Sequence, residues 1–141
     1  MNIPVQKLNE NAKVPTYAHP GDAGMDFYAL EKTVIAPGER ARIGTGIAIA
    51  IPKGFVGLVW DKSGLAFKHG ITLLAGVVDS GYRGEIQMVV LNTGSEPHTF
   101  EAGDKVAQVL IQPIEHPEVR EVTELNDTER GEDGFGSTGV A

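Results

Sequence analysis

The chain contains no cysteine among its 141 residues, which excludes disulfide bonds, thiolate metal sites and cysteine nucleophiles. This composition suits a reducing cytoplasm. Basic residues are also few, because 12 Lys and Arg stand against 19 Asp and Glu, and the net charge is −7. Such a chain lacks the basic stripe that replaces counterions on DNA or RNA, so no nucleic acid polymer is expected as a partner. A small anion remains possible where a divalent cation bridges it to the protein.

Two further absences concern location and metals. No apolar run reaches the length that spans a bilayer, and residues 1–7 lack the charged-then-apolar pattern of a signal peptide. The four histidines are scattered without a His-x-x-x-His pair, so surface or loop positions explain them better than zinc binding does. We therefore expect a cytoplasmic protein with no membrane partner and no histidine metal site.

Glycine and proline punctuate the chain, with 18 and 8 copies, and helical periods are scarce. Residues 47–51 alternate large and small apolar side chains, and Pro-Lys-Gly at 52–54 predicts a turn into a strand at 55–60. Residues 85–91 alternate less cleanly, which predicts a strand buried on both sides. Further strands are expected at 99–101, 106–111 and 118–125.

Many short strands with turn signals between them predict an all-β fold, a jelly-roll-like barrel or sandwich. Only residues 63–68 look helical. The hydrophobic fraction of 41% and the length fit one domain that buries about two-thirds of its unfolded surface. We expect a β domain over residues 1–125 and a flexible, glycine-rich C-terminal arm over residues 126–141.

The arm is the least core-like part of the chain. Residues 127–139 hold four glycines, one arginine and a single aromatic residue, Phe135, with no apolar period. Glycine lets main-chain N–H groups approach a ligand, arginine offers a planar fork for phosphate, and Phe135 offers a flat surface for a ring. These features suit a lid over a nucleotide, whereas on composition alone a solvated tail is the commoner outcome. It is not a Walker A loop, because no lysine precedes Ser137.

A second unusual segment covers residues 76–84. A carboxylate, a phenol and a guanidinium (Asp79, Tyr82 and Arg83) lie within five positions and are framed by glycines. On a tight turn this spacing can direct Asp79 and Tyr82 to one spot. The alternative is structural, because Asp-Ser-Gly is a good turn sequence, Tyr82 could cover the core and Arg83 could pair with a carboxylate.

Residues 61–66 form a third segment of interest. Lys62 followed by Ser-Gly at a strand-to-helix junction can present a cation, a hydroxyl and amides to a phosphate. The alternative is an ordinary helix start with Ser63 as the N-cap. Two weaker segments, 23–27 and 103–108, would each pass as a turn that enters a strand.

Taken in order, the five segments resemble the five signature motifs of the trimeric dUTP diphosphatases (dUTPases). They match at residues 23–27, 62–66, 76–84, 103–108 and 130–139, so the resemblance covers nearly the whole chain. It implies a jelly-roll-like homotrimer that hydrolyses dUTP to dUMP and pyrophosphate with Mg²⁺. That reaction limits uracil in DNA and supplies dUMP for dTMP synthesis. It also implies active sites shared between subunits, with the third motif and the arm supplied by different chains.

The resemblance implies roles for individual residues around the nucleoside. Asp79 would orient and activate the attacking water and touch the 3′-hydroxyl, and Tyr82 would pack against the deoxyribose and exclude a 2′-hydroxyl. Phe135 would stack over the base. The uracil edge would be read by the backbone around Gly76, Val77, Val78 and Gln87.

Further roles concern the triphosphate and the metal. The phosphates near the scissile bond would be contacted by Lys62, Ser63, Gly64 and Gln108. The terminal phosphate would be held by Arg130, Gly136, Ser137 and Thr138. Asp26 would position metal-bound water. Mg²⁺ usually keeps several waters and few direct protein ligands, so no dense ligand cluster is expected.

The chain departs from the family pattern in two motifs. The second motif usually begins with Pro-Arg, where this chain has Asp61-Lys62. Lysine keeps the charge but loses the two-point contact, and Asp61 would repel the phosphates unless it points away or helps with metal. Lys105 stands where arginine is common in the fourth motif. Two alternative functions stay open. One is a dCTP deaminase or bifunctional dCTP deaminase/dUTPase, which shares the fold, and the other is a non-catalytic trimer that binds deoxynucleotides.

Overall fold

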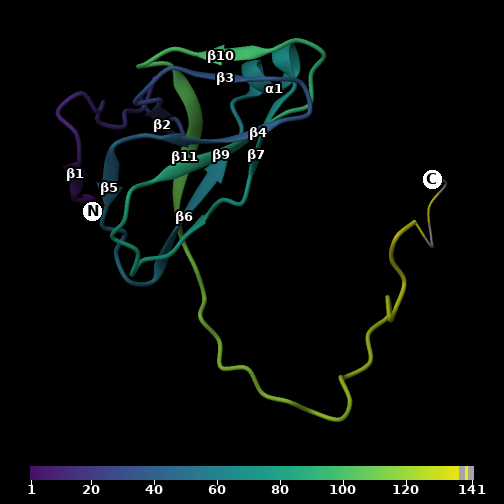
Figure 1. Cartoon of the computed structure of the whole chain (residues 1–141). Helices are drawn as coiled ribbons and strands as arrows, with labels where there is room; N and C mark the ends of the chain where they lie inside the picture. The colour runs from purple at the N-terminus through teal and green to yellow at the C-terminus, as the bar shows by residue number, and fades with distance from the viewer. Residues whose placement is uncertain (137–138, 140–141) are drawn as a thin grey trace.

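The computed structural model describes residues 1–136 and residue 139, which form a strand-rich body followed by a long C-terminal extension (Figure 1). Within these residues the strands are β1 (Val5–Lys7), β2 (Met25–Tyr28), β3 (Thr33–Ile35), β4 (Arg40–Gly44), β5 (Ile47–Ile49), β6 (Phe55–Trp60), β7 (Ile71–Leu74), β8 (Val77–Val78), β9 (Gln87–Asn92), β10 (His98–Phe100) and β11 (Lys105–Pro113). A single short helix, α1 (Ser63–His69), lies between β6 and β7 in this part of the chain.

Two larger sheets organise the body. A four-stranded sheet has the order β2-β11-β6-β8, and a three-stranded sheet has the order β4-β9-β7. The small antiparallel pairs β1-β5 and β10-β3 flank them. The central strand β11 pairs antiparallel with both β2 and β6, and Gln108 lies opposite Asp26 on one side and Trp60 on the other. This register brings three segments distant in sequence side by side.

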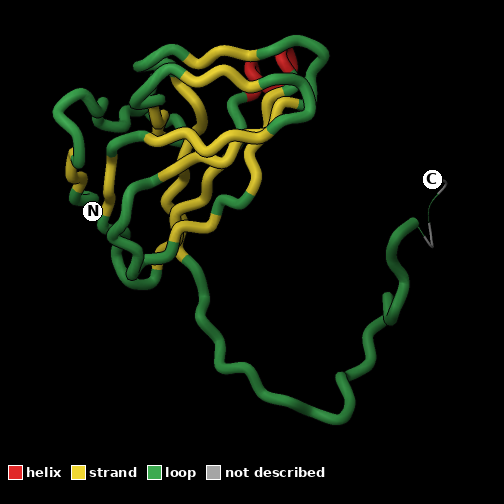
Figure 2. Tube along the Cα trace, viewed as in Figure 1, coloured by secondary structure: helices red, strands yellow, loops and turns green. Residues whose placement is uncertain are grey.

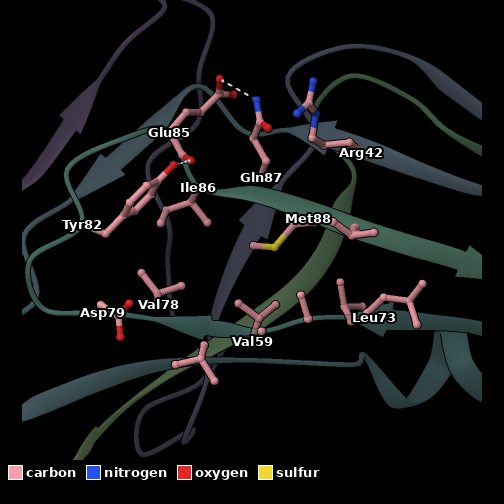
Figure 3. A pocket seen from close by; sticks show the side chains of 15 residues that line it. Arg42, Val59, Leu73, Val78, Asp79, Tyr82, Glu85, Ile86, Gln87 and Met88 are labelled. Carbon is pink, nitrogen blue, oxygen red and sulfur yellow. Dashed lines mark hydrogen bonds between the residues drawn. The ribbon is translucent and has the colours of Figure 1, made fainter.

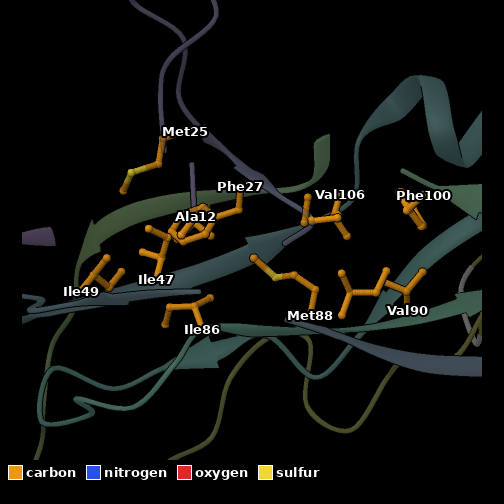
Figure 4. Close-up of a cluster of buried hydrophobic side chains, with 14 of the residues drawn as sticks. Ala12, Met25, Phe27, Ile47, Ile49, Ile86, Met88, Val90, Phe100 and Val106 are labelled. Atoms are coloured by element: carbon orange, nitrogen blue, oxygen red, sulfur yellow. The ribbon is translucent and has the colours of Figure 1, made fainter. Parts of the chain in front are cut away.

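The core lies between the two larger sheets (Figure 4). Phe27 of β2 and Val106 of β11 are fully buried in the same cluster as Met88 and Val90 of β9. The all-β fold expected from the sequence is therefore confirmed. The expected strand at 55–60 is β6 with the same bounds, and the expected helix at 63–68 is α1, one residue longer.

Two strand expectations are wrong. Strand β9 is not buried on both sides, because Gln87 is exposed and Val89 and Leu91 are half-buried, while Met88 and Val90 are buried. The outer face of the three-stranded sheet is only partly covered within one chain, which explains the alternation.

The expected strand at 118–125 does not form. Every residue from 112 to 133 is exposed, and the chain after β11 runs away from the body as loop (Figures 1 and 2). A β-strand needs a hydrogen-bonded neighbour, and no strand within the described part of the chain lies beside this segment. The expectation fails because the local sequence does not determine whether a strand finds a neighbour. In the described residues, no helix combines the length and the apolar character needed to cross a bilayer.

Candidate active site

A cavity of about 290 Å³ opens where the chain passes from β7 of one sheet to β8 of the other (Figure 3). The segment 73–79 forms one wall, and β9 with the preceding turn forms the opposite wall. The lining residues expected from the sequence are Gly76, Val77, Val78, Asp79, Tyr82 and Gln87. Figure 3 shows Asp79 and Tyr82 at one end of the cavity, with Leu73 toward the other. The structure thus brings the third segment together with Gln87.

The backbone of the cavity wall has an unusual conformation. Ala75 has φ 63° and Gly76 has φ 144°, both in a region that L side chains rarely adopt. The amide of Val59 donates to the Gly76 carbonyl at 2.8 Å, which joins this wall to β6. A Cβ at Gly76 would lie 3.0 Å from the Val59 carbonyl oxygen. Glycine at position 76 is therefore required by both backbone angle and space.

Hydrogen bonds fix the turn that carries Asp79 and Tyr82. The amide of Tyr82 donates to the Asp79 carbonyl at 3.1 Å, and the Tyr82 hydroxyl donates to the Glu85 carbonyl at 2.8 Å. Tyr82 is 46% exposed, so it does not cover the core. Arg83 donates to the carbonyls of Ser80 and Tyr82, at 2.7 and 3.0 Å, and not to a carboxylate. All four hydrogen bonds end on backbone carbonyls of residues 79–85, and none uses the Asp79 carboxylate, which is exposed.

Two charged cavity residues, Glu85 and Arg42, were not predicted from the sequence. Glu85 accepts a hydrogen bond from the Gly46 amide at 3.0 Å and one from the Gln87 amide group at 3.4 Å. Its place directly after Gly84 was a usable signal. Arg42 lines the cavity from β4. Because Arg42 is far from residues 76–84 along the chain, nothing in the sequence indicated that it lies beside them.

A second group of expected residues surrounds a buried carboxylate. The Lys62 ammonium donates to Asp26 Oδ1 at 2.5 Å, and the Lys105 ammonium lies 2.9 Å from Asp26 Oδ2. The Asp26 side chain is 2% exposed, whereas Lys62 is 27% and Lys105 45% exposed. Burial opposes ionisation of Asp26, but the hydrogen bond from Lys62 and the nearby positive charge of Lys105 outweigh it, and the pKa of Asp26 lies below the usual 3.8. The close contact with the Asp26 carboxylate raises the pKa of Lys105.

The start of α1 is not the ordinary helix start with Ser63 as the N-cap that the sequence offered as an alternative. The N-cap is Lys62, not Ser63, and its side chain makes no capping hydrogen bond. Ser63 and Gly64 are exposed at the first turn, and a Cβ at Gly64 would meet nothing within 4 Å. Gln108 donates to the Asp61 carbonyl at 2.8 Å, so it lies beside this junction. The expected phosphate-contacting residues of the body therefore gather around one junction.

Asp61 points away from this group. Its Oδ2 accepts a hydrogen bond from the Thr72 hydroxyl at 2.7 Å, and its Oδ1 accepts one from the Leu73 amide at 2.8 Å. Both partners belong to β7. Of the two possibilities left by the sequence, repulsion of phosphate is therefore avoided by orientation.

The third group lies on the arm. Arg130 donates to the Asp133 carbonyl at 2.7 Å, and Phe135 is fully exposed. Gly136 is the last residue of the continuous described range, and the expected residues Ser137 and Thr138 lie outside the described residues. Arg130, Phe135 and Gly136 do not line the cavity, and neither do Lys62, Ser63, Gly64 and Gln108. The described chain thus presents three separate groups.

Few side chains of the described residues are placed to bind a metal ion. Among the described residues, no three His, Asp or Glu side chains gather as a metal-ligand group. The buried Asp26 Oδ2 accepts no well-directed hydrogen bond, although the Lys105 ammonium is close. An acceptor of this kind can take a hydrogen bond from a metal-bound water. The residues therefore fit an ion held mainly by ligand phosphates and waters, as Mg²⁺ commonly is.

Comparison with known proteins identifies relatives of the whole chain. The family model described as dUTPase matches residues 10–139. The chain is 50% identical to a deoxyuridine 5′-triphosphate nucleotidohydrolase of Clostridium kluyveri, with 99% of each chain covered. It is also 50% identical to the protein of that name from Clostridium novyi, covering 99% of this chain and all of the relative.

Solved structures agree with this. A mutant dUTPase of Staphylococcus bacteriophage 80alpha with dUpNHpp is 32% identical to this chain and superposes with a TM-score of 0.93. The match covers 99% of each chain. A mutant dUTPase of phage phi11 of S. aureus, described with a structural Mg(II) ion, is 31% identical at a TM-score of 0.82, over 88% of this chain and 98% of the relative.

Proposed function

This chain belongs to the dUTPase family, and from that premise we propose that it hydrolyses dUTP to dUMP and pyrophosphate with Mg²⁺. The observation that carries the proposal is the cavity in which Asp79, Tyr82 and Gln87 face the same space as the backbone of residues 76–78. The reaction would limit uracil in DNA and supply dUMP for dTMP synthesis. We place it in the cytoplasm, a reducing compartment that suits a chain without cysteine.

The cavity supplies base and sugar selection. Backbone groups of Gly76, Val77 and Val78, with Gln87 on the facing wall, would read the uracil edge. Cytosine would leave buried donors and acceptors unpaired, and sites of this type discriminate by about 10⁴ or more. The Tyr82 ring would pack against the deoxyribose. Its hydroxyl is tied to the Glu85 carbonyl, so the ring cannot easily move aside for a 2′-hydroxyl.

Asp79 would act on the attacking water. Its carboxylate is exposed at the cavity end, on a turn fixed by the Tyr82 amide. One Asp79 oxygen would accept the water's proton as the water oxygen attacks phosphorus and the pyrophosphate leaves. Phosphoryl chemistry needs little covalent help, so positioning and charge neutralisation supply most of the rate.

The phosphates would meet the other two groups. Ser63 and Gly64 would contact the phosphates near the scissile bond, with Lys62 and Gln108 beside them. The arm would close with Phe135 over the base. The terminal phosphate would be held by Arg130, Gly136, Ser137 and Thr138. When bound, Mg²⁺ would neutralise the charge of the phosphates, and Asp26 would hold one of the waters of the ion.

We further propose a homotrimer with shared sites, in which residues 126–141 of one chain close over the cavity of another. Support comes from the separation of the three groups within one chain and from the extension of residues 115–133 away from the body. Co-expression of Asp79→Asn with a truncation after Leu125 tests this. Random trimers would contain about one-quarter intact sites. If mixed trimers form and no activity returns, the arm closes over its own subunit.

A pyrophosphate-release screen across the dNTPs and UTP, with and without Mg²⁺, tests the reaction itself. We expect release from dUTP that depends on Mg²⁺, and little from dCTP, dTTP or UTP. Ammonia release from dCTP would assign the chain to the deaminases that share the fold. Binding of dUTP without turnover would make it a deoxynucleotide-binding protein.

A further inference from the structure

Asp61 occupies the point where the chain leaves β6 of the four-stranded sheet and enters α1. Its two carboxylate oxygens have different partners on β7, which belongs to the three-stranded sheet. Oδ2 accepts from the Thr72 hydroxyl at 2.7 Å, and Oδ1 accepts from the Leu73 amide at 2.8 Å. Hydrogen bonds to a charged acceptor are about twice as strong as neutral ones. This one side chain therefore cross-links the two sheets.

A carboxylate at position 61 provides a hydrogen-bond acceptor for the Leu73 amide of β7. Strand β7 is an edge strand, because β9 is its only partner in the described sheet. An edge strand presents N–H groups that need a partner. The Asp61 oxygen satisfies one of them, in the place where a neighbouring strand would otherwise lie. The contact is half-buried, so water competes with it only in part.

The residues on either side of this cross-link belong to different parts of the proposed active site. Lys62 and Ser63 follow Asp61 directly, and Gln108 donates to the Asp61 carbonyl at 2.8 Å. On the other side, Leu73 begins the segment that forms the cavity wall up to Asp79. The cross-link thus fixes the phosphate-contacting junction relative to the strand that leads into the base-binding wall.

We infer that Asp61 is a positioning residue. The pair of hydrogen bonds that Asp61 accepts from Thr72 and Leu73, called the clasp from here on, sets the geometry of the β6–α1 junction. It thereby sets the geometry of the phosphate contacts made by Lys62 and Ser63. This inference rests on the proposed dUTP hydrolysis. Asp61 touches no substrate in this scheme. Its charge strengthens the two hydrogen bonds, and the clasp itself carries the function.

Two pairs of variants separate the clasp from the charge. Asp61→Ala removes both hydrogen bonds. In Asp61→Asn the amide oxygen can still accept from the Leu73 amide, and its NH₂ group can donate to the Thr72 oxygen, so the clasp persists without charge. Thr72→Val removes one hydrogen bond, and Thr72→Ser keeps the hydroxyl as the matched control.

The variants are compared in kcat and KM for dUTP, in thermal midpoint and in dUMP affinity. Misplacement of reacting groups by about 1 Å can cost 10²-fold, so we expect Asp61→Ala to lower kcat by about 10- to 100-fold. Thr72→Val should show a smaller loss, and its effect should not add to that of Asp61→Ala because both break one clasp. Asp61→Asn and Thr72→Ser should stay within about threefold of wild type. Affinity for dUMP, which lacks the two outer phosphates, should change less than about twofold.

Amide hydrogen exchange gives a readout that does not depend on turnover. We expect faster exchange at Leu73 and across residues 62–66 in Asp61→Ala, and near wild-type exchange in Asp61→Asn. Two results would overturn the inference: unchanged exchange and kcat in Asp61→Ala, or a loss of kcat in Asp61→Asn as large as in Asp61→Ala, which would mean that the charge acts directly. If wild type releases no pyrophosphate from dUTP, the proposed function fails, and the exchange pattern still decides whether the clasp exists.

Discussion

Replacing Asp26 by asparagine removes one negative charge from between two lysines and keeps the size of the side chain. The Asp26 side chain is 2% exposed, with Lys62 Nζ at 2.5 Å from one oxygen and Lys105 Nζ at 2.9 Å from the other. An asparagine presents one carbonyl oxygen and one NH₂ group. Whichever way the amide is turned, its NH₂ group faces an ammonium, so one favourable contact becomes a repulsive one.

The expected loss of folding stability in Asp26→Asn is estimated from the better-buried of the two contacts, the one with Lys62. A hydrogen bond to a charged group contributes about 1.5–3 kcal/mol, and even an asparagine oxygen that faces Lys62 leaves this ammonium without its buried negative partner, so we assign about 2 kcal/mol to the change. The Lys105 ammonium is solvent-exposed, so we add nothing for it. For a chain of 141 residues, about 2 kcal/mol corresponds to a fall in the thermal midpoint of about 6–10 °C. Wild type and variant are compared at one protein concentration, because any assembly makes the midpoint concentration-dependent.

The pH dependence gives a second test. Because the pKa of Asp26 is lowered in the folded chain, its stabilising effect is complete above its unfolded pKa of 3.8 and is lost as pH falls through the lower folded value. The stability difference between wild type and Asp26→Asn should therefore be full at pH 7 and shrink as pH falls below about 4. Denaturant unfolding at a series of pH values measures this difference.

Asp22→Asn is the matched control. It makes the same chemical change at an exposed carboxylate, whose partner His19 is 81% exposed, so we expect a change within about 0.5 kcal/mol. Equal stability of Asp26→Asn and Asp22→Asn at pH 7 would refute the reasoning. A difference between wild type and Asp26→Asn that stayed constant down to pH 2 would refute the assignment of a low pKa.

Three other substitutions test the chemistry. Asp79→Asn should fold normally and lose about 10²- to 10⁴-fold in turnover, because the amide cannot accept the proton of water; near wild-type pyrophosphate release would remove Asp79 from the mechanism. Tyr82→Ala should raise hydrolysis of UTP relative to dUTP, and an unchanged ratio would mean that another group excludes the 2′-hydroxyl. Lys62→Arg should preserve or improve turnover, since a guanidinium can make two-point contacts, whereas a severe loss would show that this site is built around lysine.

Local patterns in the sequence predicted much of the fold. The Pro-Lys-Gly turn gave the start of β6, and Gly54 has the positive φ that such a turn requires. The false strand at 118–125 has β-forming residues but no neighbour, and pairing is not a local property. For the same reason the sequence overestimated the burial of β9, because what covers a sheet face is decided by the tertiary structure.

In the site too, features set by neighbouring residues could be predicted from the sequence, and features set by tertiary contacts could not. Residues 76–84 are contiguous, so their grouping at one cavity follows from a single turn. Asp26, Lys62 and Lys105 are far apart along the chain, and they meet only because β11 pairs with β2 and with β6. The direction of the Asp61 side chain depends on where β7 lies, which no spacing near Asp61 reveals.

The exposed extension after β11 has a practical consequence for anyone who handles this protein. Residues 114–133 are all exposed, and Arg120 and Arg130 lie among them as accessible cleavage sites for trypsin-like proteases. We expect contaminating protease to remove the arm while the core around Phe27 and Val90 stays intact. A clipped preparation would then keep its melting curve and its circular dichroism spectrum. Intact mass, measured before each activity assay, is therefore the quality control that this molecule needs.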